Sequence, residues 1–149
     1  IRHLSESGIP TAVLAAPMIP GVNDSELEAI LERAAAAGAT SAGYVLLRLP
    51  HEIKQLFEEW LARHMPDRAA RVLSLVRQTR GGALYDSRFG KRQTGTGPYA
   101  ELLTQRFALA SRRLGLERRN GGTGRLDCSL FAVPEGAVTG RQEAQLELF

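Results

Sequence analysis

Two short apolar runs, separated by one amphipathic segment, constrain the fold of this 149-residue chain more than any other feature. The first run, Thr11–Ala16, is stopped by Pro17, and the second, Gly43–Leu49, is closed by Pro50. Each run has the length and composition of a buried β-strand. The segment between them, residues 23–37, has helical spacing of apolar residues and begins with residues that cap helices. Strand, helix and strand in this order predict a βαβ unit and therefore a parallel sheet.

Three further helices are predicted after the second run. The first has apolar residues at i, i+3, i+4, i+7 and i+8, namely Ile53, Leu56, Phe57, Trp60 and Leu61. The second runs from Asp67 to Thr79, and the third begins at Pro98 and ends before Gly115. The residues expected on the core side of this third helix are Tyr99, Leu102, Leu103 and Ala110. Residues 81–97 are rich in glycine and predict a long loop, and such loops usually have a function.

Two strands cannot bury both faces of a parallel sheet, which normally has more strands than this sequence supplies. We therefore expect an α/β fold in which the chain is the C-terminal part of a longer protein, with further strands before Ile1. No secretory leader and no membrane-length apolar run is visible, so we expect a cytoplasmic protein without a membrane partner. The single cysteine, Cys128, excludes an internal disulfide and a Cys-rich metal site built from this chain alone.

The charges of the chain are distributed unevenly. Residues 63–125 hold 14 Arg or Lys against four acidic residues, a balance of +10, whereas the remainder has a balance of −7. Such asymmetry predicts that the middle segment meets an anion such as nucleic acid. Basic residues alternate with aromatic residues in the loop, which suits phosphate contacts and base stacking. The candidate nucleic-acid-binding residues are Arg80, Tyr85, Arg88, Phe89, Lys91 and Arg92. The alternatives are a solvated loop over one end of the domain and an arginine excess caused by a GC-rich genome.

Ligands of parallel α/β proteins bind at the carboxyl ends of the strands. After the first strand, Ile19 offers a flat apolar contact, and Gly21 allows a ligand to approach the backbone. Asn23 and Asp24 either bind a ribose hydroxyl or cap the following helix. Arg48 stands in an apolar strand, where a charge is costly to bury without a partner. It therefore binds a ligand carboxylate or phosphate, pairs with a buried acid, or lies on a solvated edge strand.

Several segments carry a resemblance to one enzyme family. Pro17-x-Ile19-x-Gly21-x-x-Asp24 resembles the Gly-x-Ile-x-Gly-x-x-Glu pattern of radical S-adenosylmethionine (SAM) enzymes, with Pro and Asp as departures from it. Residues 74–82 (SLVRQTRGG), 85–90 (YDSRFG) and 95–107 (GTGPYAELLTQRF) resemble a bacterial branch related to spore photoproduct lyase, often labelled DNA-repair-photolyase-like. The resemblance covers nearly all of residues 1–116.

The resemblance implies a fold, a reaction and its cofactors. Residues 1–65 would be the last βα units of a partial TIM-type barrel, 66–116 a helical extension, and 117–149 a flexible tail. The reaction would be reductive cleavage of SAM at a [4Fe–4S] cluster, in nucleic-acid repair or modification, with flavodoxin or ferredoxin as reductant. The cluster ligands, Cys-x-x-x-Cys-x-x-Cys, would lie before Ile1, so we expect no catalytic residue or metal ligand in this chain. The residues expected to contact SAM are Ile19, Gly21, Asn23, Asp24 and Arg48.

The chain ends in Gln145-Leu146-Glu147-Leu148-Phe149, which resembles the pentapeptide that binds the bacterial sliding clamp. Leu148 and Phe149 would enter an apolar pocket of the clamp, and Gln145 would bond at its rim beside Leu146. The alternative is a short element docked on the domain.

Two other functions stay open for the whole chain. One is a non-catalytic module that binds DNA or the clamp, and the other is a different parallel-barrel enzyme whose Arg48 binds a phosphate.

Overall fold

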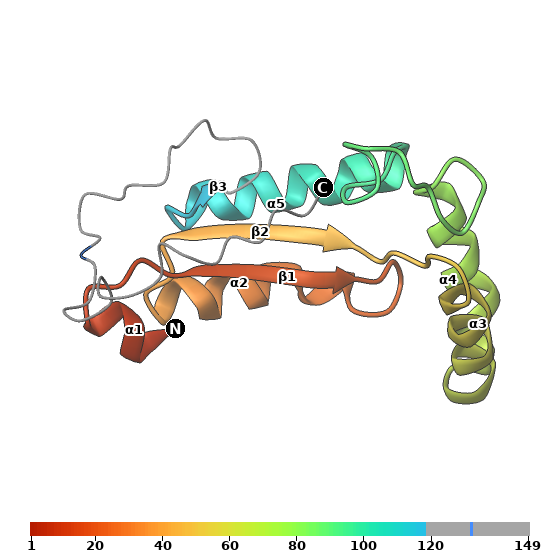
Figure 1. The fold of residues 1–149 in the computed structure, drawn as a ribbon, viewed down its shortest axis with the longest axis horizontal. Helices are drawn as coiled ribbons and strands as arrows, with labels where there is room; N and C mark the ends of the chain where they lie inside the picture. The colour runs from red at the N-terminus through yellow and green to blue at the C-terminus, as the bar shows by residue number, and fades with distance from the viewer. Residues whose placement is uncertain (119–131, 133–149) are drawn as a thin grey trace, which may run out of the picture.

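The computed structural model describes residues 1–118 and Ala132, and it shows a mixed α/β fold, as the sequence predicts (Figure 1). The elements, in chain order, are α1 (Arg2–Glu6), β1 (Ala12–Met18), the 3-10 turn η1 (Asp24–Glu26), α2 (Leu27–Ala36), β2 (Ser41–Leu46), α3 (Ile53–His64), α4 (Pro66–Gln78), α5 (Pro98–Arg113) and β3 (Glu117–Arg118). None of the helices in these described residues is long and apolar enough to cross a membrane.

The strands form one sheet in the order β1-β2-β3, and both pairings are parallel. The predicted βαβ unit is confirmed, because β1, α2 and β2 follow one another and β1 pairs with β2. The prediction that Pro17 stops the first strand is wrong, because β1 continues to Met18. The pairing with β2 is irregular between Ala15 and Met18, so Pro17 lies where a regular ladder bond is not made. Proline is tolerated at such irregularities and in edge strands.

Helices α2 and α5 cover the same face of the sheet. Paired residues such as Ala15 and Tyr44 point to one face, where the Tyr44 ring lies 5.0 Å from the Phe107 ring of α5. Leu27 and Leu31 of α2 belong to the same buried cluster, which we call the sheet core. Helix α5, which lies in the expected helical extension 66–116, thus packs on the same core as β1 and β2. β3 likewise includes the first two residues of the expected tail.

The opposite face of β1 is not covered by the described residues. Leu14 is 57% exposed, and Ala16 beside it is exposed as well. The expectation of a buried first strand therefore holds for one face only. On α5, Leu102 is 49% exposed and corrects the predicted core side, whereas Leu103 and Ala110 are buried as predicted.

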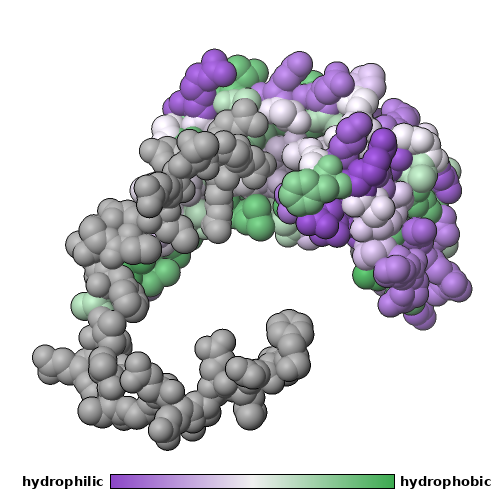
Figure 2. Space-filling view, turned by 45° about the horizontal axis from the view of Figure 1, so that its top comes forward, coloured by the Kyte–Doolittle hydropathy of each residue, from purple (hydrophilic) through white to green (hydrophobic). Residues whose placement is uncertain are grey.

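Helices α3 and α4 pack side by side beyond the carboxyl ends of the strands (Figure 1). Phe57 and Leu61 of α3 are buried against Val72 and Val76 of α4, together with Leu47 and Leu49 after β2, and we call this group the hairpin core. Ile53, Leu56 and Trp60 are 43%, 59% and 42% exposed, so the predicted apolar face of α3 is buried only in part. A helix with one helical neighbour buries a narrow stripe, which accounts for the difference. Hydrophilic side chains gather over this end of the molecule (Figure 2).

Candidate ligand site at the carboxyl edge of the sheet

The turn after β1 is held by two of the predicted site residues. The Oδ1 atom of Asn23 accepts the N–H of Ile19 at 2.7 Å, and its Nδ2 donates to the carbonyl of Pro17 at 3.1 Å. One carboxylate oxygen of Asp24 accepts the N–H of Gly21 at 2.8 Å. These bonds hold Ile19, Gly21, Asn23 and Asp24 in one compact turn. Because both polar groups of Asn23 are bonded within the turn, they stabilise its shape.

Gly21 is required by the geometry of this turn. Its φ is +73°, a conformation that side chains rarely adopt. A Cβ atom at this position would also lie 3.0 Å from Cδ1 of Leu75 in α4. The turn therefore passes close to α4 and forms one wall of a cavity between them.

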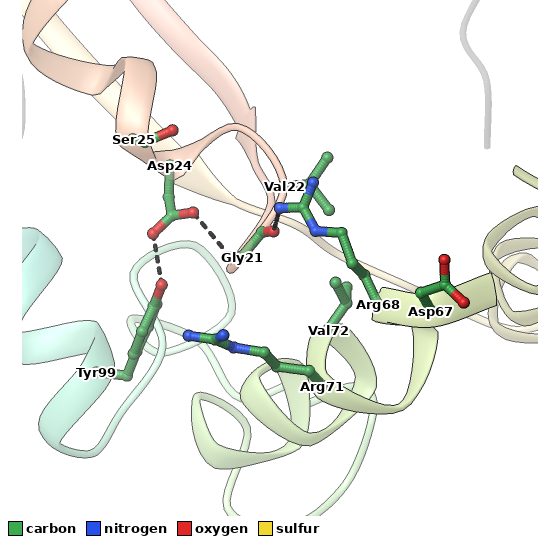
Figure 3. Close-up of a pocket in the computed structure, with 9 residues that line it drawn as sticks. All are labelled: Gly21, Val22, Asp24, Ser25, Asp67, Arg68, Arg71, Val72 and Tyr99. Atoms are coloured by element: carbon green, nitrogen blue, oxygen red, sulfur yellow. Dashed lines mark hydrogen bonds between the residues drawn. The ribbon is translucent and has the colours of Figure 1, made fainter. Parts of the chain in front are cut away.

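Asp24 is the centre of a polar network that joins the turn to α5. It is 8% exposed, and its second carboxylate oxygen accepts a hydrogen bond from the Tyr99 hydroxyl (Figure 3). Burial, reinforced by the bond to Asp24, raises the pKa of Tyr99 to about 12, so its hydroxyl remains a donor at neutral pH. Arg106 donates to the Asp24 carbonyl at 3.0 Å and forms an ion pair with Glu28 at 2.6 Å. The bond from Arg106 lowers the pKa of Glu28.

A cavity of about 390 Å³ opens beside this network. The turn after β1, the first turns of α4 and the start of α5 enclose it (Figure 3). Two guanidinium groups reach it from α4, those of Arg68 and Arg71, and Arg68 donates to the carbonyl of Gly21. The spacing of three residues places both arginines on one helix face, but the sequence does not show which turn that face meets.

Arg48 lies two residues beyond the carboxyl end of β2, next to the turn, so the prediction that it stands within a strand reaching Leu49 is wrong. The N–H of Leu47 donates to the carbonyl of Met18 at 2.9 Å and so brings the two strand ends together. The guanidinium of Arg48 approaches the Tyr85 hydroxyl at 3.5 Å, and its buried Nε has no hydrogen-bond partner. Arg48 forms no ion pair with any residue that the structure describes. Of the three predicted roles, pairing with a buried acid therefore finds no support.

Arg80 is buried at 3% exposure and connects the loop to β2. One terminal nitrogen donates to the carbonyls of Lys91 and Arg92, each at 3.0 Å. The other donates to the carbonyls of Leu46 and Leu47, at 3.3 and 2.8 Å. Burial lowers the pKa of Arg80, and the nearby charge of Arg48 acts in the same direction, against that of Asp86. Arg80 was predicted to contact nucleic acid, but here its guanidinium holds the loop.

The other predicted nucleic-acid residues lie on loop 81–97 itself. Asp86 accepts three hydrogen bonds from the Arg88 side chain, at 2.6 to 3.1 Å, which lower the pKa of Asp86 to about 2. Phe89 is 89% exposed, and the guanidinium of Arg92 lies 5.3 Å from its ring centroid. The loop thus presents an aromatic ring with a cation beside it, whereas the charge of Arg88 is already paired.

The predicted clamp-binding residues, Gln145, Leu146, Leu148 and Phe149, lie outside the described residues, as does Cys128. Within the described part, His, Cys, Asp and Glu side chains form no group of three or more that would hold a metal ion. Comparisons with protein-family models, with curated proteins and with solved structures found no match to this chain. The proposals below therefore depend on the residues and on the resemblance described above.

Proposed function

We propose that this chain forms consecutive βα units of a radical SAM-type barrel, and that the carboxyl edge of β1 and β2 binds SAM. The observation that carries the proposal is the one-sided sheet: three parallel strands in sequential order, with α2 and α5 packed on one face. A doubly wound sheet has helices on both faces, whereas a barrel has them only on its outer face. The uncovered face of β1, with Leu14, corresponds to the interior of such a barrel.

The residues at this edge can contact the adenine ring and the carboxylate of SAM. Ile19 is partly buried and offers an apolar contact to an adenine ring. Gly21 shapes the turn beside it, because its N–H bonds to Asp24 and its carbonyl accepts from Arg68. Arg48 supplies a guanidinium without an acidic partner among the described residues, and such a group suits a carboxylate. Asn23 and Asp24 fix the turn that presents Ile19. The part of this chain would be to bind and orient SAM.

The [4Fe–4S] cluster of the family does not fit the residues of this chain. Such a cluster requires several cysteine thiolates, and the chain contains only Cys128. We therefore derive no step of radical chemistry from these residues. The proposal requires an in-frame Cys-x-x-x-Cys-x-x-Cys in the coding DNA before Ile1, and its absence from the complete frame would rule out the radical reaction.

The binding part of the proposal is tested with the complete translated frame and radiolabelled SAM in equilibrium dialysis. Arg48→Gln should raise the Kd for SAM about tenfold, or about 1.4 kcal/mol, because it removes the charge-assisted hydrogen bonds. Arg63→Gln is the matched control, since Arg63 is exposed in the last turn of α3 and has no partner among the described residues. If SAM binds no better than methionine, or if both variants bind equally well, the proposal is wrong.

A second candidate function, binding of single-stranded nucleic acid, is favoured by the exposure of Phe89 and the adjacent Arg92. Exposed aromatic rings stack on bases, and cations beside them contact phosphates. This interface uses Phe89, Lys91 and Arg92 and leaves Arg80 in its structural role. Clamp binding through the terminal pentapeptide remains a separate proposal, which a deletion of residues 145–149 would test.

For the nucleic-acid interface we expect Phe89→Ala to weaken binding of a labelled oligonucleotide of about 15 nucleotides by about tenfold. The measurement is fluorescence anisotropy at two salt concentrations, because phosphate contacts make the affinity fall with salt. Leu109→Ala is the matched control, since Leu109 is a 63% exposed apolar residue on α5. Equal affinities of the two variants would show that Phe89 does not stack on a base.

A further inference from the structure

The cavity beside Gly21 has the properties of a ligand site that shares Gly21 and Asp24 with the SAM edge but takes its cations from α4. Its volume of about 390 Å³ lies within the range of small-molecule pockets. Elements far apart in the sequence enclose it, because Gly21 follows β1, Arg68 and Arg71 belong to α4, and Tyr99 opens α5. Figure 3 shows the side chain of Arg71 extending from α4 towards Tyr99.

Two arginines and two acids line this cavity, and in the described part of the chain neither Asp24 nor Asp67 forms an ion pair with Arg68 or Arg71. Arg71 forms no hydrogen bond or ion pair within the part of the chain that the structure describes, and Arg68 donates only to the Gly21 carbonyl. Asp67 also lines the cavity, but its carboxylate lies on the far side of Arg68 from Arg71 (Figure 3). Arg71 is exposed, and its guanidinium borders the cavity without a protein partner among the described residues.

Asp24 is the one buried acid at the cavity, and its carboxylate is already bonded. One oxygen accepts the Gly21 N–H, and the other accepts the Tyr99 hydroxyl and lies 4.0 Å from Arg106. These bonds hold the Asp24 carboxylate towards the turn and α5.

We infer that this cavity binds the oxyanion of a small ligand, a phosphate or a carboxylate, with Arg71 as the main contact and Arg68 as the second. The planar donors of a guanidinium match the spacing of two oxyanion oxygens. The inference does not require that the chain bind SAM, since Arg71 takes no part in the SAM proposal.

The test uses two-dimensional ¹H–¹⁵N NMR of the complete chain, titrated with inorganic phosphate or with acetate at constant ionic strength. We expect saturable shifts of the Gly21 and Val22 amides and of the Arg71 side-chain N–H. Stronger binding of phosphate would identify a phosphate ligand, and stronger binding of acetate a carboxylate. Arg71→Gln should raise the Kd about tenfold. Arg71→Lys keeps the charge but not the planar donors, so its Kd should lie between those of the wild type and Arg71→Gln.

Arg77→Gln is the matched control for this titration. Arg77 lies on the same helix, and its exposed side chain pairs with Glu58 at 3.6 Å, outside the cavity. We expect this variant to bind phosphate as the wild type does. Three outcomes would mean an adventitious ion only and would overturn the inference. The chemical shifts would not saturate, they would spread over all basic residues, or they would persist in Arg71→Gln. Failure of SAM binding in dialysis would leave these NMR outcomes unaffected.

Discussion

Replacing Arg80 with methionine should lower the free energy of unfolding by about 3 kcal/mol, because it leaves buried carbonyls without their charged donor. Four carbonyls lose that donor, two on the loop and two at the end of β2. Methionine retains most of the apolar volume of the side chain, so the loss reports the hydrogen bonds. The measurement is urea denaturation, with m-values compared between variants.

Arg77→Met is the control for Arg80→Met, because it removes a guanidinium three residues earlier in the chain. Its ion pair with Glu58 is exposed on both sides, and such pairs contribute about 0.5 kcal/mol or less. A loss below about 1 kcal/mol for Arg80→Met would show that water replaces the guanidinium at these carbonyls. Loop 81–97 would then be held by its backbone contacts alone.

Gly95→Ala should lower the free energy of unfolding by about 3 kcal/mol, since it combines backbone strain with overlap of atoms. The φ of Gly95 is +76°, and an added Cβ would lie 2.8 Å from the Thr79 carbonyl oxygen and 2.9 Å from Cδ1 of Leu46. The carbonyl belongs to the backbone and cannot rotate away. The same urea experiment measures the loss.

Gly90→Ala separates backbone strain from the overlap of atoms, the two causes of the loss of stability expected for Gly95→Ala. Gly90 belongs to the same loop and has a φ of +81°, but a Cβ there would meet nothing within 4 Å. Gly90→Ala should lower the free energy of unfolding by about 1 kcal/mol, because only the strain of the left-handed backbone contributes. Equal losses in the two variants would mean that the loop moves away from Thr79 and Leu46 without cost.

The order of β1, α2, β2, α3, α4 and α5 was predictable, because the period of apolar residues is a local property of the sequence, whereas α1 and β3 were not predicted. The four residues of the turn after β1 were also predictable as a group, since they are adjacent in the chain. Arg48 joins them because parallel pairing places the carboxyl ends of β1 and β2 side by side.

Other features depend on long-range packing, which the sequence pattern does not show. Arg80 could not be distinguished from its exposed neighbours, because its role depends on carbonyls 11 to 34 residues away. Arg71 faces a cavity only because α4 packs against the turn. Trp60 carries the same helical signal as the buried Phe57, and the number of neighbouring helices decides which of them is exposed.

The position of β1 at the end of the sheet order also affects how this chain meets other polypeptides. Among the described residues no strand pairs with its outer edge, and an unpaired edge is a template on which another strand can add. The regular pairing of β1 with β2 ends at Ala15, and Pro17 has no N–H to donate to an added strand. Pro17 therefore disfavours strand addition at the end of β1 nearest the ligand edge.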